Sequence, residues 1–158
     1  MIKFLDAAVV FEEIPDEVTL AIEITNCPGH CVGCHSPWLR EDIGEELTPG
    51  KLTELIDANR GITCVVFMGE GKDKDSLLWL AMVVRQKGLK TAIYSGSKSL
   101  DRDYDMFFDY IKVGPYIEEF GPLNKKTTNQ RLYEVKCNCA YNDIECQRID
   151  ITDKFWRK

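Results

Sequence analysis

The chain has 158 residues, of which 44% are hydrophobic and 29% charged, and this predicts a single domain spanning residues 1–158 whose core needs no disulfide or structural metal. The formal net charge of −6 opposes a broad phosphate-binding surface, so nucleic acid is not an expected partner. No apolar run approaches the ~18 residues of a membrane span and no secretory signal is present, which predicts a cytoplasmic protein without a membrane partner.

The first part of the chain predicts a strand, a cysteine-bearing loop and a helix. Residues 2–11 add a strand or a hairpin, and residues 18–25 form a strand rich in β-branched and apolar side chains. This strand runs directly into a loop marked by proline and glycine breakers. Thr48 and Pro49 then have the pattern of an N-cap and a first helical position, so we expect a helix of about three turns to follow.

Strands and helices continue to alternate after this first helix. Three further strands are predicted at residues 62–68, 90–95 and 110–113. The helix between the first two of these presents an apolar face, and Gly88 closes it; the face consists of Leu77, Leu80, Ala81 and Val84. A short helix is expected at residues 100–107, and two short strands are expected between residues 131 and 156.

Alternation of strands with helices predicts parallel βαβ units, and therefore an α/β fold. Four such strands are too few to close an eight-stranded barrel, so we expect a partial, open (β/α) barrel of mainly parallel strands. Ligands bind beyond the carboxyl ends of parallel strands, which is where the cysteine loop and the pair Gly69-Glu70 lie. An open side of such a barrel would admit a large substrate.

Three cysteines in the loop after the first core strand are the strongest chemical signal. Cys27, Cys31 and Cys34 have C-x3-C-x2-C spacing, which allows three thiolates to hold a [4Fe–4S] cluster and leaves one iron open to a cofactor. The alternative is a structural zinc site with His30 or His35 as the fourth ligand. The place of the loop at a strand's carboxyl end favours the cluster, because zinc ribbons usually place their ligands on two separate knuckles.

Other polar residues at this edge have a functional and an ordinary interpretation. Glu70 is either a ligand to a bound cofactor or a helix-capping or solvated carboxylate. Ser95 ends a core strand where a backbone can approach a ligand closely, although turn chemistry explains it equally well. Lys112 either pairs with a cofactor carboxylate or faces solvent. Gly33 and His35 flank the third cysteine, so we expect their backbones to pass close to the cluster and its cofactor.

The remaining cysteines are not expected to ligate the cluster. Cys64 lies inside an apolar strand and is predicted to be a small core residue. Cys137, Cys139 and Cys146 are predicted to be free thiols with at most adventitious metal, because a reducing compartment disfavours disulfides; a second metal site is the alternative. The aromatic and cationic residues 154–158 either pack on the core or contact a partner.

These motifs resemble the radical S-adenosylmethionine superfamily, whose hallmark is C-x3-C-x2-C after the first barrel strand. The segment 27–38, CPGHCVGCHSPW, is similar to that of the activating proteins of anaerobic ribonucleotide reductase, which accept a glycine such as Gly33 before the third cysteine. Met68-Gly69-Glu70 is similar to the family's Gly-Gly-Glu motif, with methionine at the first position. The likeness extends through residues 109–116, 128–131 and 150–156, and so covers nearly the whole chain.

The resemblance implies an enzyme with two cofactors, a [4Fe–4S] cluster and S-adenosyl-L-methionine, on a partial barrel of the radical S-adenosylmethionine type. It assigns Cys27, Cys31 and Cys34 to the cluster, and Gly69 and Glu70 to the methionyl amino group of the cofactor. An electron donor such as flavodoxin or ferredoxin would reduce the cluster. Cleavage of the cofactor would then give a 5′-deoxyadenosyl radical.

The resemblance also implies a protein substrate, the large subunit of anaerobic ribonucleotide reductase, on which the radical would generate a glycyl radical. Within the same class, the alternatives are an activase of another glycyl radical enzyme and a small radical enzyme that acts on a metabolite. The alternative from a different class is a zinc-stabilised interaction module without catalysis.

Overall fold

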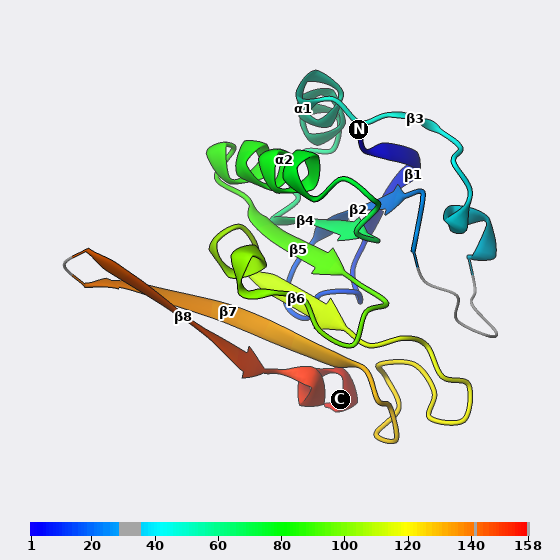
Figure 1. The fold of residues 1–158 in the computed structure, drawn as a ribbon, viewed down its shortest axis with the longest axis vertical. Coiled ribbons are helices and arrows are strands. Elements are labelled where there is room, and N and C mark those ends of the chain that lie inside the picture. Colours follow the sequence, from blue (N-terminus) through cyan, green and yellow to red (C-terminus); the bar gives the residue numbers. More distant parts are fainter. Residues whose placement is uncertain (29–35, 141, 158) are drawn as a thin grey trace.

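The protein is described by a computed structural model that covers residues 1–28, 36–140 and 142–157. Its strands form a single sheet in the order β3-β1-β2-β4-β5-β6-β7-β8 (Figure 1). The strands are β1 (Lys3–Val10), β2 (Thr19–Ile24), β3 (Glu45–Glu46), β4 (Cys64–Met68), β5 (Lys90–Tyr94), β6 (Tyr110–Val113), β7 (Arg131–Ala140) and β8 (Asp143–Asp150). The helices are α1 (Pro49–Ala58) and α2 (Lys74–Gln86), and short 3-10 turns lie at η1 (Pro37–Arg40), η2 (Arg102–Met106) and η3 (Thr152–Trp156).

The central part of the sheet confirms the predicted βαβ order. Strands β2, β4, β5 and β6 are parallel neighbours, and α1 and α2 form the crossovers β2–β4 and β4–β5. The N-cap predicted for the first helix is present, since the Thr48 hydroxyl accepts a hydrogen bond from the Lys51 N–H at 3.0 Å. This bond satisfies one of the amide groups that a helix start leaves without a partner.

Both helices pack on the same face of the sheet and enclose the larger part of the core (Figure 1). Alternate residues of each strand point to this face, as Val65 and Phe67 do in β4. The four predicted inner-face residues of the second helix are all buried there: Leu77, Leu80, Ala81 and Val84. Phe67 meets Phe108 edge to face, with ring centroids 6.2 Å apart.

The predicted fold class, a partial, open (β/α) barrel of mainly parallel strands, is wrong. Among the described residues, three strand pairs are parallel and four are antiparallel, and the α-helices number two. The structure is a mixed, eight-stranded sheet. The physical reason lies at its two ends, where β1 and β3 pair antiparallel beside β2, and the hairpin of β7 and β8 pairs antiparallel beside β6.

Two local predictions differ from the structure. The helix expected at residues 100–107 is the short 3-10 helix η2, which is capped by Asp101, whose side chain accepts from the Asp103 N–H. The two short C-terminal strands are long, because β7 and β8 pair with each other from Tyr133 opposite Asp150 to the hairpin tip. This hairpin extends well past the other strands (Figure 1).

The face of the sheet opposite the helices has its own smaller core. Cys64 and Val66 of β4 point to it, and they pack with Tyr110 of β6 and Leu132 of β7. Side chains of the β1–β2 connection and of the C-terminal segment, Ile14 and Ile151 among them, cover this cluster in place of a helix. This face therefore stays more open than the helix-covered one.

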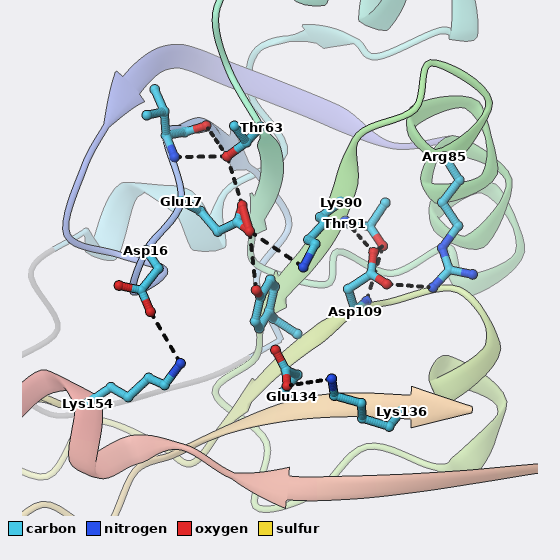
Figure 2. Close-up of polar contacts among 12 residues, drawn as sticks. Asp16, Glu17, Thr63, Arg85, Lys90, Thr91, Asp109, Glu134, Lys136 and Lys154 are labelled. Carbon is cyan, nitrogen blue, oxygen red and sulfur yellow. Dashed lines mark hydrogen bonds and ion pairs between the residues drawn. The ribbon is translucent and has the colours of Figure 1, made fainter. Parts of the chain in front are cut away.

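The amino ends of the parallel strands are joined by a polar network (Figure 2). The Glu17 carboxylate accepts hydrogen bonds from the Thr63 hydroxyl at 2.8 Å and from the Tyr110 hydroxyl at 3.3 Å. At the next strand, Asp109 accepts from the Thr91 N–H at 2.9 Å and pairs with Arg85 at 3.2 Å. These contacts hold neighbouring strands in register, and they lie at the opposite end of the strands from the cysteine loop.

Candidate functional site

The candidate site lies where the carboxyl ends of β2, β4 and β5 meet. A cavity of about 100 Å³ opens there, with lining residues from three separate parts of the chain: Cys27 and Pro28, Gly69 and Glu70, and Gly96 and Ser97. The parallel pairing of the strands produces this convergence, because it brings their carboxyl ends to one edge of the sheet. One predicted cluster ligand and the two predicted cofactor contacts after β4 are thus brought together.

Backbone hydrogen bonds fix Cys27 at this edge. Its N–H donates to the Leu39 carbonyl at 2.8 Å, and the preceding N–H of Asn26 donates to the Glu41 carbonyl at 3.1 Å. Asn26 has a φ of +59°, which turns the chain sharply out of β2. The chain before the cysteine loop and the chain after it are therefore tied together by backbone hydrogen bonds.

Gly69 and Glu70 form the second wall of the cavity. Gly69 has a φ of +120°, and a Cβ atom at this position would lie 3.2 Å from the Ile24 carbonyl oxygen. Glycine therefore allows β4 to end close against β2 without steric conflict. The Glu70 carboxylate accepts a hydrogen bond from the Ser97 hydroxyl at 2.9 Å, which holds an acidic group at the cavity.

A larger cavity of about 820 Å³ lies beside the small one, on the sheet face opposite the helices. Met68 lines the large cavity and its chain neighbour Gly69 lines the small one, so the two meet at the end of β4. Lys112 also lines the large cavity; it is 8% exposed, and its ammonium donates to the Gly114 carbonyl at 3.1 Å and lies 5.5 Å from the centre of the Tyr94 ring. Burial raises the pKa of Tyr94, which stays a neutral phenol.

The structure places the predicted site residues in three groups. Cys27, Gly69 and Glu70 line the small cavity. Ser95 is buried beneath it, where its hydroxyl accepts from the Ser97 N–H at 3.0 Å, and Lys112 lines the large cavity. The other predicted residues lie outside the described ones: Cys31, Gly33, Cys34 and His35, together with the alternative zinc ligand His30.

Ser97 had no predicted role. It lines the small cavity together with Gly96, and it is the hydrogen-bond donor to Glu70. The available signal was the Ser-Gly-Ser run after β5, since small polar residues at the carboxyl end of a parallel strand leave room for a ligand.

The donor chemistry of the small cavity fits the predicted group. A thiol, a carboxylate and close-lying glycine backbone line it, which suits a thiolate-ligated cluster beside a cofactor with an ammonium group. In comparisons with known proteins, the chain matches no family model, no curated protein and no solved structure. Within residues 1–28, 36–140 and 142–157, no three side chains of histidine, cysteine, aspartate or glutamate gather closely enough to hold a metal ion.

The cysteines outside the loop have two different environments. The prediction that Cys64 is a core residue is confirmed, since it is fully buried in β4. The prediction of free thiols at the C-terminal cysteines is wrong for two of the three, because Cys137 and Cys146 form a disulfide between β7 and β8, and Cys139 is free and exposed. Strand pairing places Cys137 directly opposite Cys146, and this juxtaposition is not visible in their spacing.

The chain also has no apparent membrane-spanning helix in its described part. Neither α1 nor α2 has the length and apolar character needed to cross a bilayer.

Cys64 is expected to be unreactive in the folded protein. Burial, and next the nearby Glu17 carboxylate, raise the pKa of its thiol far above the ordinary value of 9.0. Because the folded pKa is the higher one, the contribution of this group to stability is present below pH 9 and decreases as the pH rises above it. The test is alkylation with iodoacetamide at pH 8, followed by peptide mapping. Cys64 should be labelled only after denaturation, whereas exposed Cys139 should be labelled in the native protein. Rapid labelling of Cys64 in the native protein would contradict this buried environment.

Proposed function

We propose that the chain is a radical S-adenosylmethionine enzyme that generates a glycyl radical on anaerobic ribonucleotide reductase. The single observation that carries the proposal is the joint lining of one cavity by Cys27, Gly69 and Glu70, the described members of two motifs that are 42 residues apart in the chain (69 − 27). The proposal rests on this site and on the three-cysteine motif. It does not depend on the predicted barrel.

The residues at the sheet edge have distinct roles in this proposal. Cys27, with Cys31 and Cys34, would hold the [4Fe–4S] cluster through thiolates. When bound, the cluster would supply the electron that cleaves the sulfonium of S-adenosyl-L-methionine to methionine and a 5′-deoxyadenosyl radical. Glu70 would accept hydrogen bonds from the ammonium group of the cofactor, and Gly69 would let the backbone approach it closely.

The large cavity supports a protein substrate over a small metabolite. Its 820 Å³ is open to solvent, and Met68 in its wall directly precedes Gly69 in the wall of the small cavity. Its walls combine aromatic, acidic and cationic side chains, which suit an extended peptide segment with its own backbone groups: Tyr94, Tyr116, Phe155, Glu12, Glu13, Lys112 and Lys154. An entering loop of the reductase would cover the reacting glycine and exclude water from the radical.

The decisive first experiment is analysis of iron, sulfide and zinc after anaerobic purification. About four irons and four sulfides per chain are expected, because three thiolates and the cofactor complete one cluster. Stoichiometric zinc without sulfide would overturn the proposal in favour of an interaction module.

The assignment of the substrate has its own test. The reduced protein and S-adenosyl-L-methionine are mixed with anaerobic ribonucleotide reductase, and electron paramagnetic resonance should then detect a glycyl radical. A reductase with its radical-site glycine changed to alanine is the control and should give no signal. If the cofactor is cleaved but the radical forms only on a different glycyl radical enzyme, the chemistry stands and the proposed substrate is wrong.

Glu70→Gln is expected to weaken S-adenosyl-L-methionine binding and to leave the iron content unchanged. The substitution removes the charge and keeps a carbonyl oxygen that can accept from Ser97, so it isolates the interaction with the ammonium group. A 10- to 100-fold rise in Kd, roughly 1.4–2.8 kcal/mol, is expected in isothermal titration calorimetry under anaerobic conditions. Ser97→Ala removes the hydrogen bond but keeps the charge of Glu70, so it should raise Kd less. Loss of iron in Glu70→Gln would instead mean that Glu70 supports the fold.

A further inference from the structure

Three cysteines share one face of the β7–β8 hairpin, well away from the candidate site. Cys137 lies opposite Cys146 and is bonded to it, and Cys139 lies opposite Ile144. Residues two apart in a strand point to the same side, so the free thiol of Cys139 is on the same face as the disulfide. Cys139 and Cys146 are diagonal neighbours across the hairpin, a relation that places Cα atoms about 7–8 Å apart.

The disulfide lies at an exposed position, and a third cysteine, Cys139, stands next to it although a structural cross-link requires only two. Beyond Glu134, β7 has no β6 partner, so the two strands continue as a two-stranded ribbon that contacts η2 through Arg102 and Arg148. A single cross-link would be enough to stabilise such a ribbon. Yet Cys137 and Cys139 are both exposed and Cys146 is half-buried, so an external thiol can reach the bond and a neighbouring thiol can exchange with it.

Two arginines and the carboxylate of Asp105 lie close to Cys146, the less exposed residue of the disulfide. Arg102 donates a hydrogen bond from its guanidinium to the Cys146 carbonyl at 2.5 Å. Arg148 is two residues further along β8, on the same face as Cys146, and its side chain is 13% exposed. Asp105 pairs with both arginines and balances their charge, so exposure decides between the two sulfurs: Cys137 is the more exposed of the two bonded residues and is the better point of attack.

We propose that the β7–β8 hairpin is a thiol–disulfide exchange site for an external dithiol. A thiolate of the partner attacks Cys137 Sγ, forming a mixed disulfide and releasing the Cys146 thiolate. The second thiolate of the partner then attacks its own sulfur in the mixed disulfide and releases Cys137, so the partner becomes a disulfide and the hairpin gains two electrons and, at equilibrium, two protons. Alternatively, the Cys139 thiolate attacks Cys137 Sγ, forms a Cys137–Cys139 bond and releases the partner unchanged.

The hairpin offers a direct readout of this chemistry. Cleavage by trypsin after Lys136 and Arg148 gives one peptide that contains Cys137, Cys139 and Cys146 and none of the other cysteines. The folded full-length protein is incubated with mixtures of reduced and oxidised glutathione and quenched with acid. Free thiols are alkylated before and after reduction with two isotopic forms of N-ethylmaleimide, and mass spectrometry of the peptide gives the state of each cysteine.

We expect the Cys137–Cys146 bond to open reversibly in glutathione, with a Cys137–Cys139 isomer present in the wild type. Cys139→Ser removes the discharging thiol at an exposed position, so a glutathione adduct on Cys137 should accumulate about tenfold more than in the wild type. Thermal melting of this variant checks that the fold is retained. A bond that opens only in denatured protein would overturn the proposal in favour of a structural cross-link, and so would identical adduct levels in Cys139→Ser and the wild type.

Discussion

Cys27→Ala is expected to abolish both iron retention and cleavage of S-adenosyl-L-methionine. Three thiolates are the minimum protein ligand set in the proposed function, so loss of one leaves two irons of the cluster without a protein ligand. The fold should survive the change, because the contacts that fix residue 27 are made by backbone atoms, namely its N–H with the Leu39 carbonyl. Iron and sulfide analysis, together with chromatographic detection of 5′-deoxyadenosine, measures the two losses.

The matched control is Cys64→Ala, a change of the same residue type in the same sheet. Cys64 is fully buried and far along β4 from the cavity, so its replacement should leave a small void that costs about 1 kcal/mol of unfolding free energy and should keep the cluster. A variant with serine at Cys137, Cys139 and Cys146 should also retain iron. If Cys27→Ala keeps four irons, or if the triple variant loses them, the assignment of the ligands is wrong.

Local patterns predicted the parallel centre of the sheet well. The β-branched runs and the apolar helix faces show which side of each element is buried against a neighbouring layer. This is what hydrophobic periodicity can predict. They also placed Gly69 and Glu70 at the same sheet edge as Cys27, because parallel strands expose their carboxyl ends together. Both the crossovers and the position of the candidate site follow from this.

The edges of the sheet and the disulfide were beyond the same reasoning. Whether a terminal strand pairs parallel or antiparallel depends on neighbours that are distant in sequence. For example, β3 is only two residues long, and it pairs with β1, which precedes the cysteine loop in the sequence. The disulfide needs the register of a hairpin, which a shift of one residue would change completely. A reducing compartment predicts free thiols, and this prediction is wrong for Cys137 and Cys146, which are bonded to each other.

One buried carboxylate, Asp105 in η2, ties the hairpin to the rest of the molecule beside the β6–β7 pairing. Asp105 is 2% exposed; its Oδ1 accepts from Arg148 Nε at 2.6 Å, and its Oδ2 lies 3.0 Å from Arg102 Nε. Arg148 is itself largely buried, with 13% of its side chain exposed. Removal of Asp105 would therefore leave a guanidinium charge in a poorly solvated position.

Asp105→Ala is accordingly expected to reduce the unfolding free energy by about 3–5 kcal/mol, the usual cost of removing one member of a buried ion pair. Tm should fall on the order of 10 °C in thermal melts followed by circular dichroism. The control is Asp103→Ala in the same turn: the Asp103 side chain is 74% exposed and its partner Lys74 also pairs with Asp101, so little change is expected. The double variant Asp105→Ala with Arg148→Met should recover much of the lost stability, because it removes the unpaired charge as well. If the double variant is no more stable than Asp105→Ala, Asp105 stabilises the protein through packing and not through its charge.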